Sequence, residues 1–203
     1  MQIIQKLADL FARFPGIGRR QSKRFVFFLL GQEQEWLTAL ADAIKNLKTS
    51  IAECAECHRY FESGAGAVCE LCADAHRDAT TLLIVEKDVN LEAIEKSRAY
   101  TGRYFVLGGT VPILEKEPDK HIRLHDIKKL IVQRLKDGLA EIIIATSLNP
   151  EGENTALFLQ KEITPLVAAH KVKISFLGRG LSTGTEIEYS DTETIKSALS
   201  NRR

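Results

Sequence analysis

The sequence predicts an α/β protein built from several parts, and three features of the chain indicate this. Stretches with apolar residues at helical spacing cover most of the first 50 positions. All four cysteines follow, between positions 54 and 72. From position 80, short apolar runs alternate with amphipathic stretches, as in a parallel sheet covered by helices. We therefore expect a helical region, a cysteine module, an α/β domain and a C-terminal segment, at residues 1–52, 53–78, 79–178 and 179–203.

The helical region begins with two helices joined by a tight turn. Apolar side chains recur at helical spacing over residues 2–13, and a second helix is expected over 19–30. Pro15 ends the first helix, and Gly16 and Gly18 allow a sharp turn that leaves backbone N–H groups exposed. This order of elements is the pattern of a helix-hairpin-helix DNA-binding element.

Basic side chains gather directly after this turn. The start of the second helix carries four of them, Arg19, Arg20, Lys23 and Arg24. The first 30 residues hold six basic and one acidic side chain, although the whole chain has a net charge of +1. Because a helix N-terminus attracts phosphate, these residues and Gly16 and Gly18 are predicted to bind DNA without reading its sequence. The alternative is a simple helical hairpin with solvated arginines.

The other apolar residues of the helical region are expected in a core or a subunit interface. The second helix has a crowded apolar C-terminal half, with Phe25, Phe27, Phe28, Leu29 and Leu30, and Gly31 can cap its end. Residues 33–51 predict a third helix. Its Trp36 is expected in the core rather than as a platform on which bases stack.

The four cysteines form two Cys-x-x-Cys pairs, Cys54 with Cys57 and Cys69 with Cys72, separated by eleven residues. Four thiolates at this spacing favour a closed tetrahedral zinc site that holds the fold and does no chemistry. Two disulfides would need an oxidising compartment, and the N-terminus shows no signal peptide, so a cytoplasmic protein is expected. A redox pair would not need the second pair. His58 and His76 are expected to be ordinary surface histidines.

The region after position 80 predicts a parallel sheet. Strands are expected at residues 81–86, 141–146 and 172–178, a strand followed by a loop at 103–109, and helices at 88–97, 124–137 and 153–168. Parallel sheets bind ligands at the carboxyl ends of their strands. The polar residues expected there are Glu86, Ser147, Asn149, Glu151 and Glu153.

The C-terminal segment begins with a glycine-punctuated loop, GRGLSTGTEIEYSD at 178–191. We expect this loop to lead into a short strand, followed by a helix that Asp191 caps and that runs to about Leu199. The loop is expected either to lie in a subunit interface or to contact phosphate through Arg179.

The motifs together resemble one family along essentially the whole chain. They are the PGIG hairpin at 15–18, the four-cysteine knuckle, VLGG at 106–109, EGENTALF at 151–158 and the C-terminal loop. In this order they resemble the bacterial recombination mediators of the RecR family, and the α/β part resembles a Toprim domain. The chain differs from the family pattern at 21–22, in the loop 110–121 and at 147–150.

The resemblance implies a DNA-repair protein that acts with RecO and RecF to help load RecA at gapped or single-strand/double-strand junction DNA. It also implies a ring-like homotetramer that encircles DNA, with DNA contacts at Arg20 and Arg24. Glu86, Glu151 and Glu153 would then form an acidic surface for RecO. No apolar run approaches the length that spans a membrane, so no membrane association is expected.

The acidic residues raise the question of catalysis. Toprim enzymes hold magnesium with a glutamate and an Asp-x-Asp pair, and here Ser147 and Asn149 stand at the two aspartate positions. The three glutamates leave weak Mg²⁺ binding open, but the missing carboxylates predict a non-enzymatic DNA binder. No ATP-binding P-loop motif is present. The alternatives are a magnesium-dependent Toprim enzyme that cleaves or joins DNA, and a zinc-stabilised assembly module that does not touch DNA.

Overall fold

A computed structural model describes residues 2–64, 66–178, 184, 186–190 and 192–200 of the chain. It divides into two compact units, residues 1–51 and 52–203, which are described separately. In the described part of the chain, none of the helices combines the length and apolar character needed to cross a membrane.

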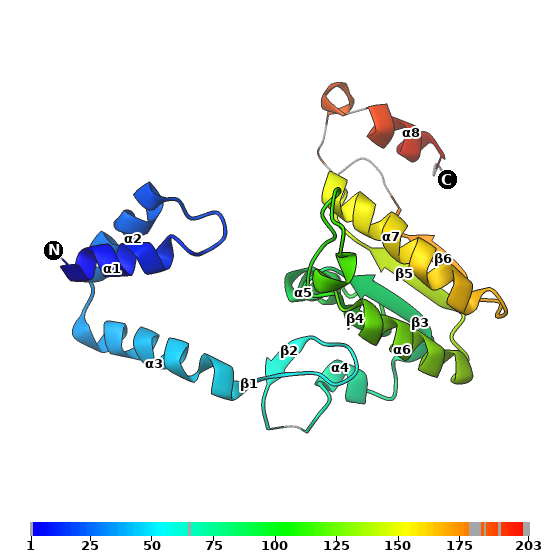
Figure 1. The fold of residues 1–203 in the computed structure, drawn as a ribbon, viewed down its shortest axis with the longest axis horizontal. Helices are drawn as coiled ribbons and strands as arrows, with labels where there is room; N and C mark the ends of the chain where they lie inside the picture. Colours follow the sequence, from blue (N-terminus) through cyan, green and yellow to red (C-terminus); the bar gives the residue numbers. More distant parts are fainter. Residues whose placement is uncertain (1, 65, 179–183, 185, 191, 201–203) are drawn as a thin grey trace. The chain divides into compact units, whose positions relative to one another are not determined.

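The first unit consists of three helices, α1 (Gln2–Phe11), α2 (Arg19–Leu30) and α3 (Gln34–Ser50) (Figure 1). The helix predicted at 19–30 and its cap at Gly31 are confirmed. α1 ends two residues earlier than predicted, because the chain already turns towards Pro15, with the N–H of Arg13 bonded to Leu10 O at 3.2 Å.

The apolar residues of this unit are mostly left at its surface. Of the side chains described, Ala8, Ser22 and Val26 are buried where α1 and α2 pack together. The prediction that Trp36 lies in the core is wrong within this unit, since its side chain is 44% exposed and contacts the Phe28 ring edge-on. α3 has no buried residue among those described. The unit therefore buries little of the apolar surface that its sequence provides.

The second unit begins with the cysteine module. Strands β1 (Ile51–Glu53) and β2 (Tyr60–Glu62) pair in a small sheet, and the short helix α4 (Glu70–Ala73) follows. These three elements were not predicted from the sequence, because runs of three or four residues carry too little periodicity to be recognised.

The predicted parallel sheet is confirmed, with strand order β4-β3-β5-β6. Its strands are β3 (Asp78–Val85), β4 (Gly102–Val106), β5 (Glu141–Ala145) and β6 (Lys173–Phe176). β3 starts three residues earlier than predicted, and its pairing with β4 shifts register between Asp78 and Leu82.

Helices cover both faces of this sheet (Figure 1). Leu82 and Ile84 of β3 belong to a core shared with α6 (Leu124–Lys136) and α7 (Pro150–Val167). Leu83 and Val85 point the other way, into a cluster with α5 (Asp88–Ser97). This alternation follows from the pleat of a strand, and it accounts for a strand that is apolar throughout.

Helix α7 begins at Pro150, three residues before its predicted start. The Asn149 side chain accepts a hydrogen bond from the N–H of Gly152 at 2.8 Å, and proline is well suited to the first helical position. The departure from the family pattern at 147–150 therefore supplies a working helix cap.

The C-terminal segment ends in α8 (Thr192–Ser200), as predicted, preceded by the 3₁₀ turn η2 (Ile187–Tyr189). The predicted short strand is wrong, because a single 3₁₀ turn, with Tyr189 N bonded to Glu186 O, takes its place. Asp191 and Arg179 lie outside the described residues.

Candidate nucleic-acid interface and metal centre

The hairpin between α1 and α2 has open backbone N–H groups. Gly16 has a φ of +77°, a conformation that favours glycine, and Ile17 N closes the turn on Phe14 O at 3.1 Å. Gly18 sits in an extended conformation at the N-cap of α2, where no side chain of the described residues caps the helix. A Cβ at Gly18 would meet no atom within 4 Å, so the backbone here is open to an approaching ligand.

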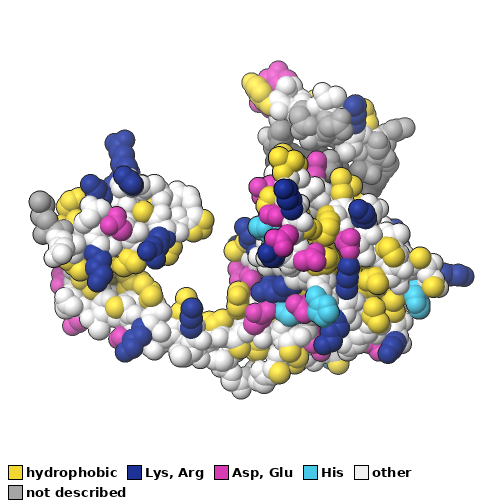
Figure 2. Space-filling view, in the orientation of Figure 1, with side chains coloured by type: hydrophobic (Ala, Val, Ile, Leu, Met, Phe, Trp, Pro, Cys, Tyr) yellow, Lys and Arg dark blue, Asp and Glu magenta, His cyan; other side chains and the backbone are white. Residues whose placement is uncertain are grey.

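The predicted basic residues surround this helix start. Arg19, Arg20, Lys23 and Arg24 are all exposed. Three of them line a groove of about 730 Å³ between α1 and α2, together with Gln5 and Asp9. Figure 2 shows Lys and Arg side chains, in dark blue, projecting from this unit. Open N–H groups beside several exposed cations make this surface suitable for binding phosphate.

Ser22 is the polar residue at the contact between α1 and α2. Its side chain is buried there, and its hydroxyl donates to Arg19 O at 3.0 Å. A small residue lets the two helices approach closely, while Arg20 and Lys23, which line the same groove, stay exposed. The departure from the family pattern at 21–22 thus keeps a small residue where the packing needs one.

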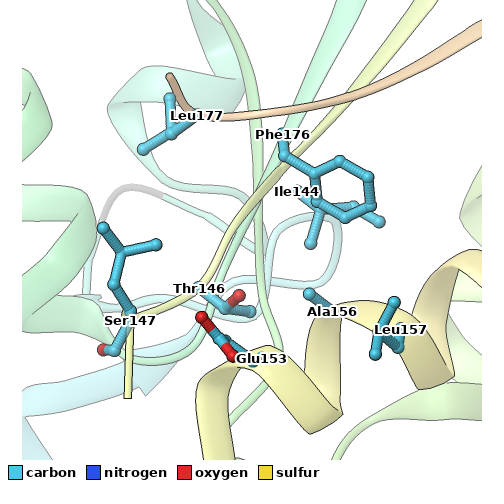
Figure 3. Close-up of a pocket in the computed structure, with 9 residues that line it drawn as sticks. Ile144, Thr146, Ser147, Glu153, Ala156, Leu157, Phe176 and Leu177 are labelled. Carbon is cyan, nitrogen blue, oxygen red and sulfur yellow. The ribbon is translucent and has the colours of Figure 1, made fainter. Parts of the chain in front are cut away.

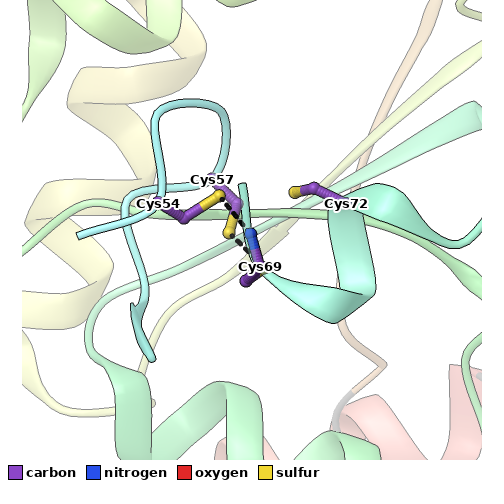
Figure 4. Close-up of side chains that lie close together, drawn as sticks. All are labelled: Cys54, Cys57, Cys69 and Cys72. Atoms are coloured by element: carbon purple, nitrogen blue, oxygen red, sulfur yellow. Dashed lines mark hydrogen bonds between the residues drawn. The ribbon is translucent and has the colours of Figure 1, made fainter. Parts of the chain in front are cut away.

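The four cysteine sulfurs lie together (Figure 4). All four Sγ atoms are within 4.8 Å of one another, and Cys57 Sγ is 3.6 Å from Cys69 Sγ. Zinc bonds to sulfur at about 2.3 Å, which corresponds to about 3.8 Å between the sulfurs of a tetrahedral site. The Cys69 N–H also donates to Cys54 Sγ at 3.3 Å. The residues therefore fit a tetrahedral metal ion.

Local structure holds the sulfurs in place. A tight turn follows Cys54, whose N–H bonds to Arg59 O at 2.9 Å, and Cys69 caps α4. The hydrogen bond between Cys57 and Cys69 raises the pKa of the Cys57 thiol and lowers the pKa of the Cys69 thiol. The two thiols therefore ionise as a pair, and a divalent cation would favour the fully ionised set.

The two nearby histidines differ from each other. His76 is exposed, as predicted. His58 is half-buried, so its assignment as an ordinary surface residue is wrong. Its Nδ1 lies 2.6 Å from Glu53 Oε1, and its ring packs edge-on against Phe105 of β4 at 5.1 Å. His58 therefore joins the cysteine module to the sheet.

The cysteine module covers the edge of the large sheet at β4. The N–H of Val106 donates to Cys57 O at 2.8 Å. Arg103 Nη1 donates to Leu71 O and Cys72 O at 3.0 and 2.7 Å. A metal in the module would thus also support the edge strand of the α/β domain.

The structure separates the three predicted acidic residues. Glu86 is at the end of β3 with 5% of its surface exposed, and Ser147 donates to it through both its N–H and its hydroxyl. Glu151 is exposed and accepts from the Thr110 hydroxyl at 3.3 Å, while Glu153 is half-buried. Among the residues described, the four cysteines are the only group of three or more such side chains that could hold a metal ion.

Loop 107–123, which contains the divergent segment 110–121, is fastened to α7. The N–H of Val111 donates to the Thr155 hydroxyl at 2.8 Å, and Asn154 Nδ2 donates to Val111 O at 2.9 Å. Asn154 and Thr155 were not singled out from the sequence as residues that hold this loop. Within the loop itself, Gly109 permits a close approach, since a Cβ there would come within 2.7 Å of His121 O. A glycine pair after a strand thus marked a close backbone approach.

A small pocket lies at the carboxyl ends of β5 and β6 (Figure 3). It has a volume of about 190 Å³, and its walls are largely apolar, with Ile144, Leu157 and Phe176. Ser147 and Glu153 also line it. Its size and its apolar walls do not suit a nucleotide, which needs several polar and cationic partners.

The fold and the sites define a class before any comparison with known proteins. A helix-hairpin-helix unit, a four-cysteine metal module and a parallel α/β domain with a glutamate after its first strand describe a Toprim-type protein associated with nucleic acid. Three family models match in the same order. Residues 4–48 match the RecR helix-hairpin-helix, 80–178 the Toprim domain and 180–203 the RecR C-terminal region.

Relatives extend this match to the full length. The chain is 37% identical to the recombination protein RecR of Acidothermus cellulolyticus, over 99% of this chain and 96% of that protein. It is 34% identical to that of Dehalococcoides mccartyi, over 98% and 93%. It is 35% identical to that of Lactococcus lactis subsp. cremoris, over 98% and 96%. The chain belongs to the RecR family, which confirms the resemblance seen in the sequence motifs.

Proposed function

We propose that this protein is a non-enzymatic DNA-binding mediator of recombination in DNA repair. The observation that carries the proposal is the start of α2, where uncapped N–H groups lie beside Arg19, Arg20 and Lys23. Such a surface binds the phosphate backbone and makes no use of base edges, so binding is independent of sequence and sensitive to salt. The relatives' name, recombination protein, supports the biological setting.

The proposed partners are those that the resemblance to the RecR family implies. The protein acts in the cytoplasm with RecO and RecF, binds gapped or single-strand/double-strand junction DNA, and helps RecA load there. Each of the four predicted parts has its own role. Residues 1–52 bind DNA, 53–78 hold zinc, 79–178 form the Toprim domain, and 179–203 take part in oligomerisation. The exposed Glu151, with Glu153, belongs to the acidic surface that RecO contacts.

We also propose a ring-like tetramer. The first unit supports this, since Phe27, Phe28 and Leu30 are each more than half exposed. A unit of about 50 residues buries only a small apolar core and is marginally stable alone. A second copy of the chain would bury these exposed side chains in an interface.

The metal in the module is a single structural zinc. Four sulfurs, with no fifth ligand grouped with them in the described part of the chain, favour zinc in a closed site. Cys54, Cys57, Cys69 and Cys72 would hold it, and its role is to stabilise the fold. Metal analysis of the purified protein should give one zinc per chain.

The decisive experiment measures DNA binding by gel shift on gapped DNA, across a salt series, with and without Mg²⁺. The test variant is Arg20→Glu with Arg24→Glu. The matched control is Lys136→Glu with Lys171→Glu, which reverses two exposed basic residues of the second unit. We expect the parent and the control to bind, and the test variant to lose the shift. Milder Arg→Gln changes at the same positions should lower the slope of log Kobs against log[salt] by about 2.

Two results would contradict the proposal. Equal binding by the test variant and the parent would favour an assembly module that does not touch DNA through the hairpin. Magnesium-dependent nicks that disappear in Glu86→Gln would favour the second candidate, a Toprim enzyme. The position of Ser147 and Asn149 where the enzymes carry aspartates speaks against that candidate.

A further inference from the structure

Glu86 is a buried acid to which the DNA-binding role assigns no part. It stands at the end of β3 with 5% of its surface exposed. Taking a carboxylate out of water is costly unless donors replace the lost water. The role of the Glu86 side chain can therefore be inferred from the groups that contact it.

One residue supplies donors to both oxygens of the carboxylate. The N–H of Ser147 donates to Glu86 Oε1 at 2.8 Å, and the Ser147 hydroxyl donates to Glu86 Oε2 at 2.7 Å. Ser147 stands at the first aspartate position of a magnesium-binding Toprim pattern. In such a pattern two carboxylates would repel each other unless a cation lay between them. Here a neutral donor takes the place of the second carboxylate, so the pair needs no cation.

The first turn of α7 packs against the same carboxylate. A Cβ at Gly152 would lie 2.9 Å from Glu86 Oε1 and 2.1 Å from Ser147 O. Glycine is therefore required for this approach, which brings the positive end of the helix dipole to the acid. This gives the glycine of the EGE motif a physical reason.

The backbone of Glu86 is also tied down. The N–H of Gly108, in the loop after β4, donates to Glu86 O at 2.9 Å. Glu86 thus connects three segments that are far apart in the sequence, which are the end of β3, the loop after β4 and the start of α7.

We propose that Glu86 is a positioning residue that fixes the start of α7 without magnesium, and that it contacts neither a cation nor a partner. Its partners Ser147 and Gly152 complete this anchor. The outward acidic group is then Glu151, one residue before Gly152, and its direction is set by the anchor. The role of Glu151 rests on the proposed function, whereas the anchor itself does not.

The test compares Glu86→Ala and Glu86→Gln by hydrogen exchange of the Ser147 amide. The alanine removes both acceptors, so exchange should become about 10-fold faster, as expected for the loss of one buried hydrogen bond. The glutamine keeps an oxygen for the Ser147 N–H and offers an N–H to the hydroxyl oxygen. It should therefore rescue the protection to within about threefold of the parent. Glu151→Gln is the matched control and should leave Ser147 unchanged.

A second pair of variants covers the case in which Glu86→Ala does not fold. Gly152→Ala should accelerate exchange at Ser147, because the new Cβ pushes α7 away. Gly178→Ala is the matched control, since a Cβ there meets nothing within 4 Å. Equal Ser147 exchange in these two variants would overturn the anchor.

Magnesium separates an anchor from a cation site. We expect no change in the parent's melting temperature when MgCl₂ is added. A rise in melting temperature that Glu86→Gln abolishes would overturn the inference, as would unchanged Ser147 exchange in a folded Glu86→Ala. Failure of the parent to bind gapped DNA would instead count against the proposed function and leave the exchange result standing.

Discussion

The two units of this protein handle their apolar residues in opposite ways. The second unit buries them, with Leu159, Ile163 and Ile142 fully enclosed between the sheet and its helices. The first unit exposes them, and α3 has no buried residue in the part that the structure describes. The α/β unit therefore carries its own core, whereas the helical unit carries the proposed DNA-binding surface and an exposed apolar surface, which we propose a second copy covers.

The two units also differ in where their polar contacts lie. Buried polar pairs such as Glu86 with Ser147 lie in the second unit, next to its core. The basic residues of the hairpin lie in the unit that has the smaller core. Binding of DNA and of a second copy would then stabilise the first unit most, because ligands stabilise the state that they bind.

The largest effect should come from the metal module, which tests whether the second unit depends on more than its core. Cys69→Ser removes one buried ligand of the proposed zinc, and we expect a loss of more than about 4 kcal/mol in the free energy of unfolding, as for other lost structural metals. The Val106 amide, bonded to Cys57 O, should lose protection as the edge of β4 is uncovered. Urea unfolding and hydrogen exchange measure both effects.

His76→Ala is the matched control for this variant, because His76 is exposed close to the module. It should retain the stability and the zinc content of the parent. Normal stability of Cys69→Ser, with Val106 still protected, would show that the α/β domain stands without the module.

A pair of Leu→Ala variants tests the difference between the units directly. Leu159 is fully buried, and its replacement should cost about 3 kcal/mol at any protein concentration. Leu30 is 65% exposed, and its replacement should cost less than about 0.5 kcal/mol in an isolated subunit. If copies associate through α2, Leu30→Ala should instead weaken the oligomer. Urea unfolding and sedimentation across a dilution series measure the two quantities.

An oligomer distribution that Leu30→Ala left unchanged at every dilution would contradict this prediction, and the exposed residues of α2 would then have another role. Dissociation of the oligomer by Leu30→Ala, with the melting temperature of the α/β unit unchanged, would show that the exposed apolar residues of the first unit serve assembly.

Much of this architecture could be predicted from the sequence because its signals are local. Apolar periodicity identified the longer helices and the four strands of the large sheet, and the cysteine spacing identified the module. The strand expected in the C-terminal segment was wrong, because a short apolar-polar alternation does not distinguish a strand from the 3₁₀ turn at Ile187–Tyr189.

The contacts between distant segments could not be predicted in this way. From the sequence alone, Glu86 is interpreted as a carboxylate at a strand end, but its burial depends on Ser147, 61 positions away. His58 is likewise interpreted as a surface residue, but in the structure it contacts Phe105 and Glu53. Such partners are brought together by the strand order, which periodicity does not reveal. The glycines were the best indication, since Gly109 and Gly152 both mark close approaches of backbone.

The smallest predicted effect concerns the edge strand β6, the least buried strand of the large sheet. Glu141 of β5 accepts a hydrogen bond from Ser175 Oγ at 2.7 Å and lies 3.1 Å from Lys173 Nζ, both on β6. The Ser175 hydroxyl and then Lys173 lower the pKa of the Glu141 carboxyl. Because the folded pKa is below the unfolded pKa, this contribution is complete above the unfolded value and is lost as the pH falls through the folded value.

We therefore expect Glu141→Gln to be less stable than the parent by about 0.5 kcal/mol at pH 7, and the difference to vanish as the pH falls below about 4. Melting temperatures of the two proteins at several pH values measure it, and Glu62→Gln, at an exposed carboxylate on β2, is the control. A difference that persisted at low pH would mean that Glu141 acts through packing. The contact between β5 and β6 would then depend on packing rather than on charge, as in the core of the second unit and unlike the exposed apolar residues of the first unit.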